Sequence, residues 1–282
     1  MNKIEELEKE TAALDSPGRA NVSVPAWTST PAAVQRPHGL LSALRSYFIL
    51  APLIWVYTIV LGTISLLCSL FDRDGRVQHN LARLWSWLIM KTILSPLTVT
   101  GGENLASHSP KPRVYAVTHA SALDIPILYV YLPFQFRIIF KSELLSYPFI
   151  GWHLKRSGQV CINQQNPRDS IGAIKSALRS LRRGVPLVIF PEGGRTRDGE
   201  LQPFLPGTFF LAIKAQADIV PIALAGTFDL LPMNTYHIKC QPLEMRVGKA
   251  VSTTGLTLQD TDKVSAEVKA AIESLYSAPR RG

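Results

Sequence analysis

The feature that most limits the fold is an uncharged segment of 25 residues, Tyr47–Phe71. About 20 apolar residues in a helix cross the hydrocarbon core of a bilayer, so this segment is long enough to insert into a membrane. A soluble helix that is apolar on every side is found only in the core of a large protein. The segment therefore predicts membrane insertion, either as a spanning helix or as one arm of a helical hairpin in a single leaflet.

A second apolar stretch, Leu81–Leu97, carries Arg83 and Lys91 together with Trp85 and Trp87. Cationic and aromatic side chains on one helix suit the boundary between lipid and water. This stretch therefore predicts an amphipathic helix at the membrane interface, which would complete the hairpin.

These segments define a membrane-anchoring helical region at residues 39–97. The preceding residues 1–38 are first highly charged and then rich in Pro, Ser, Ala and Thr. Such a composition predicts a disordered tail. The tail does not resemble a signal peptide, in which basic residues directly precede an apolar run.

Residues 98–282 have a different character, because short β-branched runs alternate there with helical patterns. Helices are predicted at 171–183, stopped by Gly184, and at 261–276. The runs lie at 113–119, 136–140, 159–163, 185–190, 218–225 and 243–251. This alternation predicts an α/β domain with a mostly parallel sheet flanked by helices.

The charge balance indicates an acidic partner. The net charge is +9, and the mean hydropathy is +0.12. A basic chain that is also apolar on average favours an anionic membrane surface over nucleic acid, and no nucleic-acid-binding signature occurs. The 3 cysteines and 6 histidines show no paired ligand spacing, so neither a disulfide framework nor a metal site is predicted.

Two motifs directly follow predicted strands: HASALD at 119–124 and FPEGGRT at 190–196. In open parallel sheets, ligands bind at the carboxyl ends of the strands, so both motifs lie where a site is expected. In the first motif, a neutral His119 can take a proton from a hydroxyl while Asp124 holds the other ring nitrogen. The alternative is that Asp124 caps a helix and His119 is an ordinary strand-end residue.

The second motif has the residue types of an anion site. Gly193 and Gly194 let backbone N–H groups approach an anion, and the Arg195 guanidinium matches a phosphate. Glu192 can orient a hydroxyl or pair with Arg195. The alternative is a glycine-rich surface turn with a salt bridge.

Together and in this order, the two motifs resemble the signature blocks NHxSxxD and FPEGTRS of the 1-acylglycerol-3-phosphate O-acyltransferase family. Here the blocks read THASALD from Thr118 and FPEGGRT from Phe190. The segments Lys141–Leu144 and Val220–Ile222 are also similar to that family. The resemblance covers roughly residues 98–250.

The resemblance implies an O-acyltransferase that esterifies a lysolipid, most simply 1-acylglycerol-3-phosphate to phosphatidic acid. It makes His119 the general base and Asp124 its orienting partner, without a covalent intermediate. Acyl-CoA or acyl carrier protein is the implied co-substrate, with no metal or bound cofactor. The implied substrate-binding residues are Glu192, Gly193, Gly194, Arg195, Thr196 and Lys141.

The chain also departs from that family's pattern. Asn163 and Gln164 stand where the family usually has an Asp-Arg pair whose arginine contacts phosphate, Gly194 replaces Thr, and 204–207 reads FLPG. A lysolipid with another head group, such as a lyso-ornithine lipid or another lysophospholipid, is therefore an open alternative. A catalytically silent lipid-binding relative and a hydrolase are others.

Two expectations concern the surroundings of the protein. The basic group on the helix at 171–183 is either a solvated surface or a contact for anionic lipid or an acidic carrier protein. Its members are Lys175, Arg179, Arg182 and Arg183. We expect a membrane location, namely a bacterial inner membrane with the site facing the cytoplasm.

Overall fold

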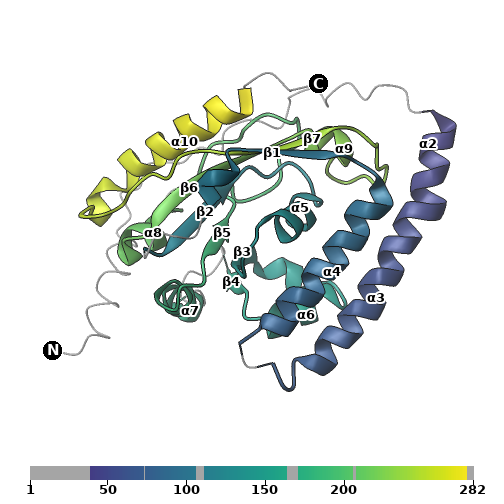
Figure 1. Ribbon diagram of the computed structural model, residues 1–282, viewed down its shortest axis with the longest axis horizontal. Helices are drawn as coiled ribbons and strands as arrows, with labels where there is room; N and C mark the ends of the chain where they lie inside the picture. Colours follow the sequence, from purple (N-terminus) through teal and green to yellow (C-terminus); the bar gives the residue numbers. More distant parts are fainter. Residues whose placement is uncertain (1–38, 73, 106–110, 164–170, 206–207, 278–282) are drawn as a thin grey trace. The chain divides into compact units, whose positions relative to one another are not determined.

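The structure is a computed structural model that describes residues 39–72, 74–105, 111–163, 171–205 and 208–277. The predicted tail at 1–38 lies outside the described residues. Figure 1 shows a central sheet with helices on both faces.

Seven strands of the described residues form one sheet in the order β1-β7-β6-β2-β5-β3-β4. All neighbouring strands are parallel except β6 and β7, which confirms the predicted mostly parallel α/β fold. The strands are β1 (Leu97–Thr100), β2 (Arg113–Val117), β3 (Arg137–Lys141), β4 (Val160–Ile162), β5 (Leu187–Ile189), β6 (Asp218–Ala225) and β7 (Leu243–Val247).

The helices of the described residues alternate with the strands after β1. The α-helices are α2 (Leu40–Arg45), α3 (Ala51–Cys68), α4 (Arg76–Ile93), α5 (Asp124–Tyr131), α6 (Ile150–Arg156), α7 (Ile171–Arg182), α8 (Phe210–Ala215), α9 (Thr227–Leu230) and α10 (Thr261–Ser277). Shorter 3-10 turns are η2 (Gly102–Leu105), η3 (Ser142–Ser146) and η5 (Leu258–Asp260), and η1 (Ser46–Leu50) is a π-helical segment.

The sheet has an apolar core on each face because successive strand side chains point to opposite sides. In β2, Tyr115 and Val117 pack in the cluster under α4 and α5, whereas Val114 and Ala116 pack in the cluster under α7, α8 and α10. A strand buried on both faces needs a continuous apolar run, which is the pattern that predicted these strands.

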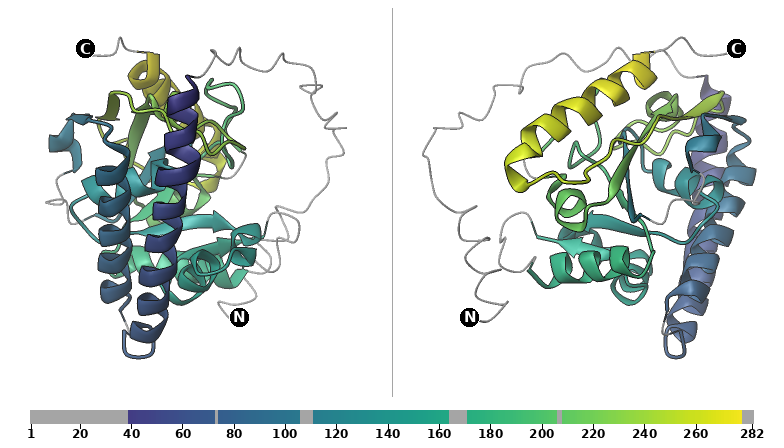
Figure 2. Two further views of the ribbon diagram at one scale, coloured as in Figure 1. Left: turned by 90° about the vertical axis from the view of Figure 1, so that its right-hand side faces the viewer. Right: turned by 60° about the vertical axis from the view of Figure 1, so that its left-hand side comes forward.

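The uncharged segment forms a long helix. Leu40–Cys68 comprises α2, η1 and α3, and by length and composition it can cross a membrane. Only 17% of its most apolar window is buried. The predicted second helix is also present but shifted, because α4 begins at Arg76 and ends at Ile93. The two helices lie side by side as a hairpin (Figure 2).

The long helix turns its polar side inward. Its buried side chains in α3 are Thr58 and Ser65, while large apolar side chains such as Ile59 and Leu67 are exposed. Thr58 Oγ1 accepts a hydrogen bond of 3.0 Å from the Trp85 indole of α4. Ser65 Oγ lies 2.7 Å from Nδ1 of His153 in α6. An exposed apolar face with an inner polar face is the reverse of a soluble helix.

Candidate active site

His119 and Asp124 meet at the carboxyl end of β2. Nδ1 of His119 lies 2.8 Å from Oδ2 of Asp124. Because a carboxylate only accepts hydrogen bonds, Nδ1 carries the proton and Nε2 keeps its lone pair. The His119 side chain is 14% exposed and that of Asp124 is fully buried, so the imidazole is open to solvent while its carboxylate partner is not. This geometry suits a general base whose ring is oriented by a carboxylate.

The same carboxylate shapes the loop between β2 and α5. Oδ2 of Asp124 also accepts hydrogen bonds of 2.8 Å from the backbone N–H groups of Ala120 and Ser121. The Ser121 hydroxyl donates to the Leu231 carbonyl at 2.9 Å. Asp124 is the first residue of α5, and its partners lie before the helix rather than in its first turn. It therefore orients His119 and fixes the loop instead of acting as an ordinary cap.

Phe190 also belongs to the site, although its residue type indicated no role there. Its ring stacks on the His119 imidazole with centroids 4.1 Å apart and an angle of 23° between the planes. The stack limits how far the imidazole can tilt. The sequence feature that could have indicated this role is the position of Phe190 as the first residue of the second motif, directly after β5.

Glu192 binds backbone rather than a neighbouring cation. Oε1 accepts a hydrogen bond of 2.7 Å from the His119 amide, and Oε2 accepts one of 2.9 Å from the Gln202 amide. Burial raises the pKa of the Glu192 carboxyl to about 7, against the lowering effect of these two amides. No ion pair with Arg195 is present among the described residues. Of the two interpretations from the sequence, the pairing with Arg195 is wrong.

Thr196 is turned into the protein. It is 2% exposed, its amide donates to the His119 carbonyl at 2.9 Å, and its hydroxyl donates to Asp198 at 2.7 Å. The hydroxyl also accepts the Gly199 amide at 3.1 Å. Since the amide and the hydroxyl of Thr196 both bond to other groups of the protein, the geometry favours a structural role over contact with substrate.

Two cations lie at the same edge of the sheet as His119. Lys141 ends β3, Arg195 follows β5, and β5 pairs with both β3 and β2. A side-chain carbon placed on Gly194 would lie 3.7 Å from Nζ of Lys141, so this lysine reaches the second motif. Both cationic side chains are half-buried and have no acidic partner among the described residues.

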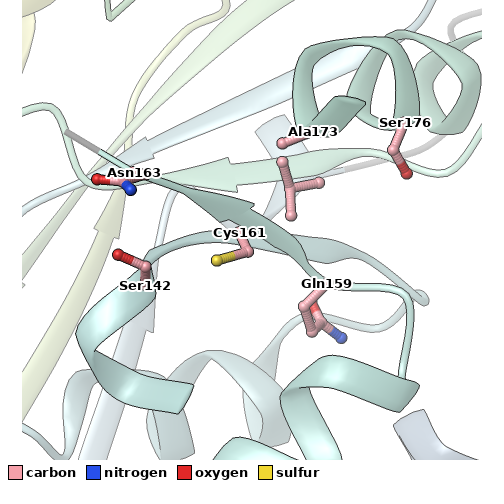
Figure 3. Close-up of a pocket in the computed structure, with 7 residues that line it drawn as sticks. Ser142, Gln159, Cys161, Asn163, Ala173 and Ser176 are labelled. Atoms are coloured by element: carbon pink, nitrogen blue, oxygen red, sulfur yellow. The ribbon is translucent and has the colours of Figure 1, made fainter. Parts of the chain in front are cut away.

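The altered second block adjoins this edge. Asn163 directly follows β4, in which Ile162 pairs with Lys141, while Gln164 lies outside the described residues. Asn163 lines an open pocket of about 380 Å³ with Ser142 and Cys161 of η3 and β4 and with Ala173 and Ser176 of α7 (Figure 3). Asn163 therefore lies one residue beyond the strand position that pairs with Lys141.

The basic group on α7 extends away from the site. Its four cations are exposed, as expected of a charged helix face. Because β4 and β5 are both parallel to β3, α7 must run back from the carboxyl edge of the sheet to the opposite edge. Arg182 and Arg183 at its end are therefore remote from His119. Among the described residues, no cluster of three or more His, Cys, Asp or Glu side chains is arranged to hold a metal ion.

Comparisons with known proteins place this sequence among acyltransferases. A family model named Acyltransferase matches residues 96–225. A chloroplast 1-acyl-sn-glycerol-3-phosphate acyltransferase of Brassica napus is 35% identical over 170 residues, or 60% of this chain and 48% of that protein. A 1-acyl-sn-glycerol-3-phosphate acyltransferase of Chlamydomonas reinhardtii is 32% identical over 234 residues, or 80% of this chain and 68% of that protein.

The fold also has a counterpart among solved structures. The crystal structure of PlsC, the 1-acyl-sn-glycerophosphate acyltransferase of Thermotoga maritima, superposes with a TM-score of 0.66 at 23% identity, covering 86% of this chain and 98% of that one. The chain spans about half the length of the Brassica relative. The Chlamydomonas match covers most of both proteins, and the residues matched by the family model span both strand-end motifs. The chain therefore belongs to the acyltransferase family that includes the 1-acyl-sn-glycerol-3-phosphate acyltransferases.

Proposed function

We propose that this protein transfers an acyl group from a thioester to the free hydroxyl of 1-acylglycerol-3-phosphate, giving phosphatidic acid. The observation that carries the proposal is the oriented His119, with its free Nε2, at the same sheet edge as Lys141 and Arg195. A base at the same sheet edge as two cations that have no acidic partner among the described residues suits an acceptor with both a hydroxyl and a phosphate.

The reaction proceeds by direct attack. Nε2 of His119 takes the hydroxyl proton as the oxygen attacks the thioester carbonyl, and Asp124 stabilises the imidazolium through its hydrogen bond of 2.8 Å. The tetrahedral intermediate collapses, the C–S bond breaks, and the proton passes from His119 to the leaving thiolate. The new ester and a free thiol are the products, and the protein supplies no nucleophile.

The second motif supplies backbone donors as well as charge. The amides of His119, Ala120 and Ser121 are already bonded to Glu192 and Asp124. Among the described residues, the Gly194 and Arg195 amides have no acceptor. We propose that these two amides, with Lys141 and the Arg195 guanidinium, bind the anionic part of the substrates. In this proposal, Glu192, Gly193 and Thr196 do not contact substrate. They fix the backbone path of the second motif.

Product analysis tests the proposal. The purified protein in lipid vesicles receives labelled acyl-CoA or acyl carrier protein with 1-acylglycerol-3-phosphate, a lyso-ornithine lipid or another lysophospholipid. We expect phosphatidic acid as the main product and a loss of about 10²- to 10⁴-fold in kcat for His119→Ala. Free fatty acid instead of an ester would indicate a hydrolase. Lipid binding without any product would indicate a silent relative.

Matched charge variants test head-group recognition. Lys141→Gln and Arg195→Gln should each weaken use of the phosphorylated acceptor by about 10- to 150-fold in kcat/KM, the equivalent of one charge-assisted hydrogen bond. Arg183→Gln, at the opposite edge of the sheet, is the control and should change nothing. Equal losses with a neutral lysolipid would contradict phosphate recognition by these two side chains.

We propose that residues 39–97 anchor the domain of 98–282 in one leaflet rather than spanning the bilayer. The long helix bonds to the domain of 98–282 at Ser46 and Ser65, so about 28 Å of its length lies along protein. A spanning helix would need lipid over a similar distance. Exposed Lys155 and Arg156 on α6, which packs on α3, suit anionic head groups.

The membrane we propose is a bacterial inner membrane with the site facing the cytoplasm. Leu40→Cys and Phe71→Cys, made in a chain whose own cysteines are replaced by serine, test the anchoring mode in sealed vesicles. In a single-leaflet arrangement, both cysteines should be labelled from the same side of the vesicle membrane. Labelling of the two positions from opposite sides would establish a spanning helix.

A further inference from the structure

The last turn of α10 closes one side of a narrow crevice beside the catalytic histidine. His119, Glu192, Thr196 and Glu200 line this crevice together with Tyr276. Tyr276 lies outside the residues 96–225 that the family model matches. The fold therefore brings a residue from outside the matched segment next to His119.

The Tyr276 hydroxyl holds the loop that follows the second motif. It donates a hydrogen bond of 2.6 Å to the Gly199 carbonyl. Gly199 has a positive φ of +88°, and a side-chain carbon there would lie 2.9 Å from the Phe228 ring. The loop Thr196–Gln202 is therefore held between α10 on one side and Phe228 of α9 on the other.

This loop is bonded to both backbone groups of His119. The Thr196 amide donates to the His119 carbonyl at 2.9 Å. The Gln202 amide donates at 2.9 Å to Oε2 of Glu192, whose Oε1 accepts the His119 amide at 2.7 Å. A displacement of the loop therefore reaches His119 by two separate hydrogen-bonded routes.

The end of α10 is itself fixed to the sheet. Nη1 of Arg246 in β7 donates to the Leu275 carbonyl at 2.6 Å. Nε of Arg246 lies 2.7 Å from Oε2 of Glu244, and both of these side chains are buried. Tyr276 thus extends from a rigid support, which a residue needs if it is to locate a loop.

We propose that Tyr276 is a positioning residue, which holds His119 in its reactive orientation through the loop Thr196–Gln202 and Glu192. The proposal rests on the proposed acyl transfer for its kinetic readout. A misplacement of about 1 Å at a reacting group can cost 10²-fold in rate, so a partial loosening has a measurable effect on turnover.

The test compares Tyr276→Phe with Ile272→Val. Tyr276→Phe removes only the hydroxyl, and we expect kcat to fall about 3- to 10-fold, the equivalent of one net hydrogen bond, with KM for both substrates unchanged. Ile272 is fully buried on the same helix, so Ile272→Val weakens the packing of α10 without touching the loop. It should lower Tm without lowering kcat.

Hydrogen exchange supplies a readout that does not depend on activity. Peptides containing the His119 amide and the 192–205 segment should exchange faster in Tyr276→Phe and unchanged in Ile272→Val. Gly199→Ala, which disturbs the loop while keeping the hydroxyl, should reproduce the loss of kcat. The proposal would be overturned if these peptides exchanged at the wild-type rate in Tyr276→Phe. It would also be overturned if Tyr276→Phe and Ile272→Val lost kcat equally. A wild-type protein without transferase activity would instead overturn the proposed function, and the exchange result would still decide the role of Tyr276.

Discussion

The carboxylate of Asp124 offers the sharpest test of the catalytic geometry, through Asp124→Asn. Oδ2 of Asp124 accepts three hydrogen bonds of 2.8 Å, from Nδ1 of His119 and from the Ala120 and Ser121 amides. An amide oxygen in the place of Oδ2 can accept the same three bonds, so the loop should keep its path. The asparagine carries no charge, however, and the imidazolium formed during the reaction loses its counter-ion.

The expected loss follows from the strength of that contact. A hydrogen bond to a charged group contributes about 1.5–3 kcal/mol, and each 1.4 kcal/mol is tenfold in rate, so kcat should fall about 10- to 150-fold. The effect on stability should be small. The new amide nitrogen would occupy the site of Oδ1, which is buried without a partner among the described residues, but the substitution also removes a buried charge. These two changes oppose each other.

The assay measures kcat, KM and Tm for Asp124→Asn beside Asp262→Asn. Asp262 is exposed in the first turn of α10, so its variant should match the wild type. A kcat for Asp124→Asn within threefold of the wild type, at unchanged Tm, would refute the argument that the charge assists His119. A large fall in Tm would mean instead that the carboxylate acts mainly on the fold.

Three further predictions concern stability. Burial raises the pKa of the Glu192 carboxyl from 4.5 to about 7. The stability that its protonated form contributes is therefore complete below pH 4.5 and is lost as the pH rises through 7. Relative to wild type, Glu192→Gln should gain up to about 3 kcal/mol in free energy of unfolding between pH 4.5 and pH 8, measured by urea titration. Burial lowers the pKa of His153 from 6.5 to about 4, so stability should be lost as the pH falls from 6.5 to 4, and His153→Gln should flatten that loss in the same titration. A side-chain carbon on Gly62 would lie 2.9 Å from Cβ of Phe149, so Gly62→Leu should cost about 1–3 kcal/mol and lower Tm, whereas Gly172→Leu, in open space, should not. The first two predictions would be contradicted if the stability difference between variant and wild type did not change with pH. The third would be contradicted if Gly62→Leu and Gly172→Leu had the same Tm.

Much of the sheet could be predicted because its strands are buried on both faces. The run at 218–225 became β6 with the same bounds, since an almost continuous apolar sequence is needed between two layers of helices. The strand β1 was not predicted. Its sequence LTVT is short and half polar. The strand lies at the edge of the sheet beside β7, where polar side chains can face solvent.

The site was predictable to the extent that local chemistry defines it. His119 and Asp124 are five residues apart across a strand end and a helix start, so their contact follows from local geometry. The roles of Glu192 and Thr196 were less accessible. Glu192 and the Thr196 amide both bond to the backbone of His119, more than 70 residues away in the sequence, and backbone groups have no sequence signature.

The sequence by itself determined the fold class, the long apolar helix, the family and the pair at the centre of the site, because each depends on periodicity or on side-chain chemistry within a few residues. Tertiary structure decided the rest. It turned the polar side of the long helix inward onto α4 and α6, stacked Phe190 on His119, and brought Tyr276 from the last helix to the loop beside the site. Such contacts join distant parts of the chain, so they exist only once the sheet has set the order of its strands.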